Sequence, residues 1–105
     1  MVAQTSATRA PLEHLLAVLR AQKEALSRRY NVHSLGVFGS YVLGEAKPGS
    51  DLDVLVEYAT PPTLFEYVRL QNELSERLGG QVDLVMKSAL KPVLGRRILE
   101  EVIYV

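Results

Sequence analysis

Two apolar runs joined by a glycine-containing turn constrain the fold of this chain more than any other feature. The first run, Ser34 to Phe38, is typical of a buried strand, and it stops at Gly39 in a turn whose amides are expected to open a short helix. Backbone amides at the start of a helix bind phosphate. The second run, Asp51 to Glu57, has the pattern of another strand. Together they predict two strands with a phosphate-binding turn between them.

The second run alternates, so its side chains divide between two faces of a sheet. Leu52, Val54 and Val56 take one face, whereas Asp51, Asp53, Leu55 and Glu57 take the other. Asp51 and Asp53 are therefore neighbours, about 7 Å apart at the backbone. Two like charges so placed repel unless a cation lies between them, and hard carboxylate oxygens suit Mg²⁺ bound together with substrate phosphates. The sequence predicts that a metal and a triphosphate meet at Ser40.

These residues form the pattern GSxxxGxxxxxSDxD, which runs from Gly39 to Asp53. It resembles the pattern of the DNA polymerase beta-like nucleotidyltransferases, and most of all that of the minimal nucleotidyltransferases encoded beside HEPN-domain partners. The resemblance covers residues 12–105, because a later VDLV strand lies at 82–85 and a closing LKPVLGRRILEEVIYV tract lies at 90–105. It implies an α/β (α+β) fold in which a small mixed β-sheet is covered by helices.

The resemblance also implies which residues form the site. Asp51 and Asp53 would bind two Mg²⁺ ions, and Asp83 would complete the ion on the side of the attacking hydroxyl and act as base. The implied nucleotide-binding set, with ATP as the substrate, is Gly39, Ser40, Gly44 and Ser50. Ser50 is expected to act indirectly, because its hydroxyl can fix the turn before the strand.

The rest of the chain predicts one domain at 11–105, preceded by a disordered leader at 1–10. Leucines at three- and four-residue spacing predict a helix from Pro11 to Tyr30. A second helix is expected to start at Pro61-Pro62 and to stop at Gly79-Gly80. Its predicted inward side chains are Leu64, Phe65, Val68, Leu74 and Leu78.

A third strand is predicted at 81–86, followed by a helical stretch that Ser88 caps and Pro92 interrupts, and by an apolar tail at 102–105. The helices are expected to cover one face of the sheet. Asp83 lies between apolar residues, which suggests the interior of the sheet, where a charge needs a reason. If the third strand lies beside the Asp51 strand, as in the resembled family, Asp83 joins the other two carboxylates.

Composition excludes several classes of protein. Lysine plus arginine and aspartate plus glutamate each total 12, so no net charge attracts nucleic acid, and direct nucleic-acid binding is not expected. The absence of cysteine excludes disulfides and fits a cytoplasmic location. No run of 18 apolar residues is present, so no membrane association is expected. A hydrophobic fraction of 48% suggests that a partner covers apolar surface, in a homo- or hetero-oligomer.

The turn after Gly39 carries no cation. Many relatives in the resembled family have arginine where this chain has Val42 or Leu43, so either the affinity for triphosphate is weaker or a cation comes from Lys47 or from a partner chain. His14, His33 and Glu57 are expected to be solvated or structural. Lys47, Lys87, Arg96 and Arg97 are each able to meet phosphates, with solvation as the default expectation.

The resemblance implies an antitoxin that transfers AMP to a tyrosine hydroxyl of a HEPN ribonuclease toxin. This AMPylation would be an in-line attack on the alpha-phosphorus, with pyrophosphate leaving. A second hypothesis is a non-catalytic antitoxin that neutralises its partner by binding alone, with Tyr41 and Tyr104 as contacts. A third is nucleotidyl transfer to a small molecule such as an aminoglycoside.

Overall fold

The computed structural model describes residues 11–105, so the leader predicted at 1–10 lies outside the described residues. Four strands form one mixed sheet in the order β3-β2-β1-β4, in which β1 runs antiparallel to β2 and β4, and β2 runs parallel to β3. The elements along the chain are α2 (Leu12–Tyr30), β1 (Val32–Phe38), α3 (Ser40–Leu43), β2 (Leu52–Tyr58), α4 (Leu64–Leu78), β3 (Val82–Met86), the 3-10 turn η1 (Lys87–Ala89), α5 (Pro92–Glu101) and β4 (Ile103–Tyr104). The predicted mixed sheet with helices is confirmed.

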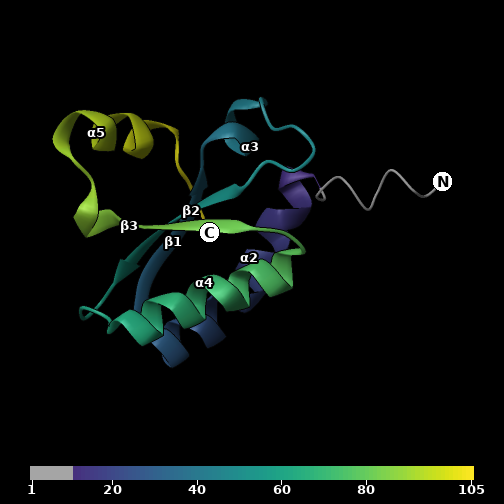
Figure 1. Ribbon diagram of the computed structural model, residues 1–105. Helices are drawn as coiled ribbons and strands as arrows, with labels where there is room; N and C mark the ends of the chain where they lie inside the picture. Colours follow the sequence, from purple (N-terminus) through teal and green to yellow (C-terminus); the bar gives the residue numbers. More distant parts are fainter. Residues whose placement is uncertain (1–10) are drawn as a thin grey trace.

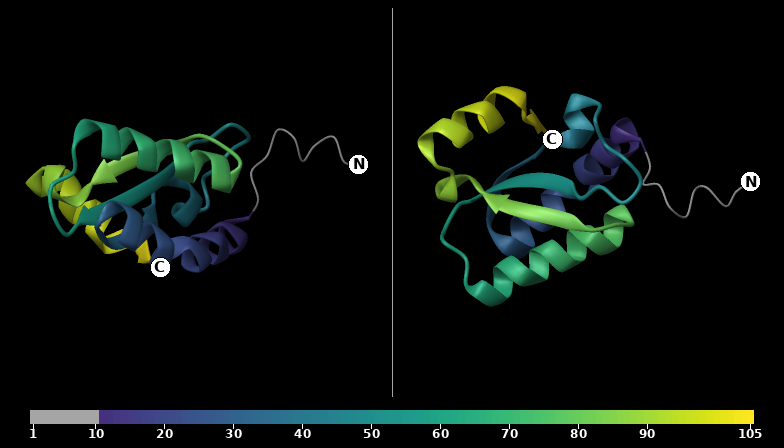
Figure 2. Two further views of the ribbon diagram at one scale, coloured as in Figure 1. Left: turned by 90° about the horizontal axis from the view of Figure 1, so that it is seen from below. Right: turned by 45° about the horizontal axis from the view of Figure 1, so that its top comes forward.

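Helices lie on both faces of this sheet (Figures 1 and 2). The main core joins α2 and α4 to the face of β2 that carries Leu52, Val54 and Val56. A smaller core on the opposite face joins Leu55 to Phe38 and to Ile98 of α5. The alternation predicted for β2 is confirmed, and α5 departs from the expectation that the helices share one face. The acidic side of β2 therefore faces α5. Within residues 11–105, no helix is both long and apolar enough to cross a membrane.

The helix boundaries follow local capping chemistry. Helix α2 ends at Asn31, which has the left-handed backbone (φ 58°) of a helix C-cap. Helix α4 begins after Thr63, whose side chain accepts a hydrogen bond from the Glu66 amide while the Glu66 carboxylate accepts one from the Thr63 amide. The predicted start at Pro61-Pro62 is wrong, because this capping box sets the boundary.

The inward face predicted for α4 is wrong over its first turns. Leu64, Phe65 and Val68 are 78%, 83% and 42% exposed, whereas the buried leucines of this helix are Leu70, Leu74 and Leu78. The fully buried side chains of α4 begin only at Leu70, so the apolar spacing of its first turns does not coincide with a core.

Strand β3 lies at an edge of the sheet, and Asp83 is exposed, so the predicted sheet interior is wrong. The outer side of β3 is nevertheless not bare. The Ser75 hydroxyl accepts a hydrogen bond from the Val82 amide at 3.1 Å, and the Gln71 side chain accepts one from the Leu84 amide at 3.1 Å. The Tyr67 hydroxyl donates to the Leu84 carbonyl. One stripe of α4 thus satisfies three backbone groups of the edge strand that point away from β2.

The apolar tail forms a fourth strand that periodicity did not predict. Ile103 and Tyr104 pair with Val37 and Gly36 of β1, and the Val105 amide donates to the Leu35 carbonyl at 3.0 Å. This pairing holds the end of α5 over the sheet.

Candidate active site

Two of the three predicted carboxylates lie side by side at the start of neighbouring strands. Asp53 and Asp83 are register partners in the parallel pairing of β2 and β3, and both lie on the face of α5. Asp51 lies just before β2 and is exposed. The expectation that the third strand lies beside the Asp51 strand is confirmed, and the sheet register brings Asp83 next to Asp53.

The crowding of acidic groups changes the chemistry of Asp53. Burial is the largest cause of a raised pKa there, followed by the charges of Asp83 and Asp51, a hydrogen bond with Asp83, and the charge of Glu101; together they raise the pKa of Asp53 to about 6. A carboxylate in this setting is stabilised by any cation that reaches it. The site therefore favours a bound positive charge.

The glycine turn packs directly against Asp53. Gly39 has φ 81°, and a Cβ atom built on it would lie 2.0 Å from Asp53 Oδ2. A side chain at this position would overlap the carboxylate, so only glycine allows the close approach of turn and acid. The predicted short helix opens here as α3, and it ends at Gly44, which has the left-handed conformation of a C-cap. Ser50 fixes the loop before β2, because its hydroxyl accepts a hydrogen bond from the Lys47 amide at 2.8 Å.

A cleft of about 610 Å³ opens between this turn, the two carboxylates and α5. Phe38, Gly39 and Leu43 line it from β1 and α3, and Asp53, Asp83 and Val85 line it from the sheet. The opposite wall comes from the segment after β3, with Ala89, Leu90, Lys91, Leu94, Arg97, Ile98 and Glu101. The cleft has room for a small charged ligand with the acidic pair at its base.

The glycine turn and the carboxylates beside it are the parts that the sequence pattern predicts for a nucleotide-handling enzyme, and the structure adds the cleft next to them. A family model described as a nucleotidyltransferase domain matches residues 19–105. The chain belongs to the nucleotidyltransferase domain family. It is accordingly a nucleotidyltransferase, as the sequence predicts.

Relatives match this nucleotidyltransferase over most of their length. The protein adenylyltransferase MntA of Thermococcus cleftensis is 47% identical over 94 residues, which are 90% of this chain and 95% of that protein. A solved structure assigned as a minimal nucleotidyltransferase is 40% identical with a TM-score of 0.68, over 84% of this chain and 93% of its own. A structure of a tri-AMPylated Shewanella oneidensis HEPN toxin with an MNT antitoxin contains a chain of the same fold, at 21% identity, a TM-score of 0.62, and 86% and 70% coverage.

The donor atoms of the nucleotidyltransferase site suit Mg²⁺. Among residues 11–105, no three acidic, histidine or cysteine side chains are already gathered closely enough to hold a metal ion. Mg²⁺ does not require such a cage, since it usually takes one or two carboxylates and completes its shell with water and substrate phosphates. Asp53 and Asp83 supply hard oxygens of this kind beside a cleft that can admit a phosphate.

Three charged residues of α5 and the segment before it belong to the cleft, although sequence reasoning did not place them there. Lys91 and Arg97 line the wall opposite the carboxylates. Glu101 lies at the end of α5, and its Oε2 accepts a hydrogen bond from the Gly39 amide at 2.7 Å. No local signal in the sequence marks these residues, because only the return of α5 over the acidic face of the sheet brings them to the turn.

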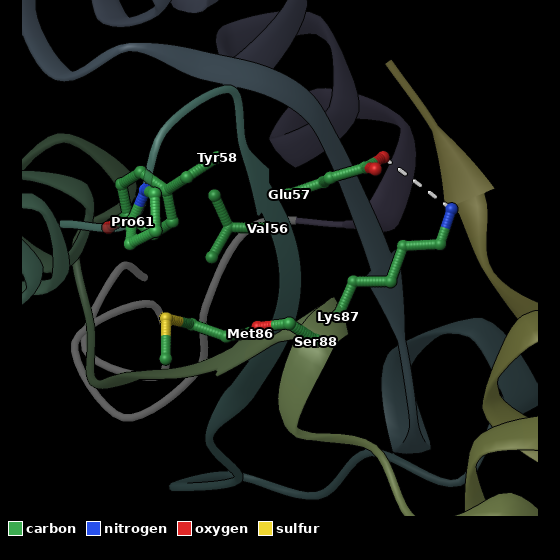
Figure 3. Close-up of a pocket in the computed structure, with 7 residues that line it drawn as sticks. All are labelled: Val56, Glu57, Tyr58, Pro61, Met86, Lys87 and Ser88. Atoms are coloured by element: carbon green, nitrogen blue, oxygen red, sulfur yellow. Dashed lines mark ion pairs between the residues drawn. The ribbon is translucent and has the colours of Figure 1, made fainter.

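A second cavity, of about 310 Å³, lies near the other ends of β2 and β3 (Figure 3). Figure 3 shows Glu57 and Lys87 pointing toward each other at this cavity, and their charged atoms are 3.5 Å apart. Lys87 Nζ also lies 5.9 Å from the ring centre of Tyr104. Both charges remain partly exposed, in line with the prediction of solvated groups, and neither residue lines the acidic cleft.

Other candidates lie outside the cleft. His14 and His33 are exposed, and no ion pair or side-chain hydrogen bond of theirs is found within residues 11–105. Lys47 is exposed in the loop after α3 and does not line the cleft.

Proposed function

We propose that this nucleotidyltransferase transfers AMP from ATP to a hydroxyl of a protein acceptor, in a reaction that depends on Mg²⁺. The observation that carries the proposal is the Asp53 and Asp83 pair, which adjoins the Gly39 turn in one cleft. The 47% identity to a protein adenylyltransferase over nearly its whole length supports a protein as the acceptor.

In this proposal Asp51, Asp53 and Asp83 hold two Mg²⁺ ions. When bound, the ions neutralise phosphate charge and lower the pKa of the attacking hydroxyl. The acceptor oxygen forms a bond to the alpha-phosphorus while the bond between that phosphorus and the beta-bridging oxygen breaks, and pyrophosphate leaves. Asp83, which is exposed at the cleft, takes the hydroxyl proton.

The α3 turn would bind the phosphates of the nucleotide. The Gly39 amide and the Ser40 hydroxyl bind the departing phosphates, and Gly44 and Ser50 keep the turn and the following loop in shape. These contacts hold the phosphorus in line between the attacking oxygen and the leaving group. Positioning of this kind supplies much of the rate enhancement in nucleotidyl transfer.

We further propose that the acceptor is a tyrosine of a HEPN ribonuclease toxin, which makes the chain an antitoxin. The Shewanella oneidensis complex, in which a HEPN toxin carries AMP and is bound by an MNT antitoxin of the same fold, supports this partner. Residues 11–105 form one sheet with its helices, so a second domain for acceptor recognition is not seen in this part of the chain. A partner protein would bring its own tyrosine to the cleft. We infer a cytoplasmic location, because ATP and the proposed acceptor, a ribonuclease toxin, would be found there together.

The test is transfer of label from alpha-labelled ATP in a cell extract that contains the native partner, with and without Mg²⁺. Wild type is compared with Asp53→Asn and with Glu57→Gln. Glu57 is the matched control because it lies on the same face of β2 but pairs with Lys87 outside the cleft. The proposal predicts one labelled protein band that Asp53→Asn abolishes and Glu57→Gln retains.

Other outcomes decide between the rival functions. Label in RNA rather than protein would identify an RNA-modifying enzyme and overturn the proposed acceptor. Label in a small molecule would favour the aminoglycoside hypothesis. If neither variant nor wild type transfers label while Asp53→Asn still co-purifies with the partner, the chain neutralises by binding alone.

A further inference from the structure

We propose that Arg97 of α5 binds the triphosphate of the nucleotide and is the main protein cation of the cleft. The inference rests on the proposed function, in which Arg97 would offset the negative charge of the substrate. A bound triphosphate carries several negative charges and meets a cleft that already contains Asp53, Asp83 and Glu101. A cation from the protein would offset part of this negative charge in addition to any metal.

The α3 turn supplies no such cation. Its four residues, Ser40 to Leu43, include no basic side chain, and Leu43 presents an apolar side chain to the cleft. Lys47, the next basic residue along the chain, does not line the cleft. Among residues 11–105, the basic side chains that line the cleft are Lys91 and Arg97, and both belong to the opposite wall.

The opposite wall presents Arg97 on the stripe of α5 that faces the turn. Leu94, Arg97, Ile98 and Glu101 recur at three- and four-residue spacing, and all of them line the cleft. Ile98 is buried in the smaller core, which fixes this face of α5 against the sheet, and Glu101 lies close enough to the turn to accept a hydrogen bond from the Gly39 amide. Arg97 directly precedes Ile98 and lies about one helical turn before Glu101.

The guanidinium of Arg97 is also available to a ligand. Within residues 11–105 its guanidinium forms no ion pair and no side-chain hydrogen bond, and Arg97 remains exposed at the cleft. A planar guanidinium can donate two parallel hydrogen bonds to phosphate oxygens, which a lysine ammonium cannot do in the same geometry. Lys91 lines the same wall and would add charge without this fork.

The next residue provides a matched control. Arg96 has the same side chain on the same helix, is exposed, and does not line the cleft. Removal of either arginine changes the net charge equally. Only the removal of Arg97 takes a guanidinium out of the cleft.

The experiment measures the dissociation constants of Mg²⁺-AMP-PNP and of AMP by titration calorimetry on the full chain, for wild type, Arg97→Gln, Arg97→Lys and Arg96→Gln. We expect Arg97→Gln to weaken AMP-PNP binding about tenfold or more, the size typical of a lost charge-assisted hydrogen bond. AMP binding should change much less, and Arg97→Lys should recover part of the loss. Arg96→Gln should bind AMP-PNP within about twofold of wild type.

The inference on Arg97 is overturned, and the proposed function is not, if wild type binds AMP-PNP and the dissociation constant of Arg97→Gln equals that of Arg96→Gln. Equal weakening of AMP and AMP-PNP would also overturn it, because the contact would then not be to the beta- and gamma-phosphates. If the wild type binds no AMP-PNP, the proposed function fails with it. Unchanged circular dichroism of Arg97→Gln ensures that any loss reflects the cleft rather than unfolding.

Discussion

The carboxylate of Glu101 accepts a hydrogen bond from the Gly39 amide, with Oε2 and the amide nitrogen 2.7 Å apart. This amide is the one proposed to meet the leaving phosphates. An anionic side chain thus takes the position of an anionic ligand, and its charge is also one of those that raise the pKa of Asp53. A nucleotide that binds the turn has to displace this carboxylate from the amide.

We therefore predict that Glu101→Gln binds Mg²⁺-AMP-PNP about two- to fivefold more tightly than wild type, the range expected for removal of one partly exposed charge. Glutamine keeps an oxygen for the Gly39 amide but loses the repulsion of phosphate. Glu100→Gln is the control, because Glu100 is exposed and does not line the cleft. Weaker binding by Glu101→Gln would show that the carboxylate assists the ligand instead of competing with it.

The raised pKa of Asp53 makes the stability of the metal-free protein depend on pH. The folded state holds the proton of this carboxyl more tightly than the unfolded state, so wild type loses stability as pH rises from about 4 through about 6. Asp53→Asn removes the repelled charge, and in EDTA at pH 7.5 it should raise the free energy of unfolding by about 1 kcal/mol, allowing for screening by water. The gain should vanish at pH 4. Urea denaturation at both pH values tests this, and a less stable variant at pH 7.5 would contradict it.

Gly39→Ala is expected to abolish AMP transfer, because the new methyl group would lie 2.0 Å from Asp53 Oδ2 and must push the turn or the acid away. Gly79→Ala is the control, since Gly79 also has a positive φ (73°) but a Cβ atom there meets no atom within 4 Å. Its cost should be limited to backbone strain, about 1 kcal/mol, with transfer retained. Labelled AMP incorporation and thermal unfolding of both variants separate strain from overlap. Activity in Gly39→Ala would mean that the close approach is not required.

A fourth prediction concerns the fold away from the site. Glu73 of α4 joins the two helices of the main core layer, since it accepts hydrogen bonds from the Tyr30 hydroxyl at 2.7 Å and from Arg29 at 2.5 Å. Burial alone would raise the pKa of Glu73, but the hydrogen bonds from Tyr30, Arg29 and Arg77 outweigh burial and lower the pKa.

Glu73→Gln should accordingly reduce the free energy of unfolding by about 1 kcal/mol at pH 7. Because a lowered pKa stabilises the fold only while the carboxylate is ionised, the difference from wild type should shrink as pH falls below the ordinary glutamate value of 4.5. Urea denaturation measures both effects, with Glu76→Gln, exposed on the same helix, as the control. A constant difference from pH 7 to pH 3 would contradict the assigned role of the charge.

The parts of this molecule that the sequence predicts well are those set by local pattern. The alternation of 51–57 assigns both faces of β2, and Gly39 stops β1 where the turn packs on Asp53. Asn31 and Gly79 end their helices, and both adopt the left-handed backbone conformation that glycine and asparagine tolerate. Each of these features depends on a few neighbouring residues, so sequence spacing is enough to recover it.

The features that sequence reasoning missed depend on where a segment lies relative to distant ones. Phe65 has the spacing of a core residue but is 83% exposed, because α4 reaches the main core only through its later turns, from Leu70 onward. Asp83 reads as interior from its apolar neighbours, although β3 is an edge strand whose outer side is covered by α4. Arg97 and Glu101 have the pattern of surface charges. They line the cleft only because α5 packs on the smaller core.

The hydrogen bonds that Tyr67, Gln71 and Ser75 make to the outer side of β3 also limit how a partner can bind. An edge strand with free amides and carbonyls invites an extended peptide to add to the sheet. Here the amides of Val82 and Leu84 and the carbonyl of Leu84 are already occupied by side chains of α4. The edge beside the carboxylates is therefore closed to β-augmentation, and an acceptor protein that delivers a tyrosine to this cleft has to be recognised through side-chain surfaces rather than by extension of the sheet.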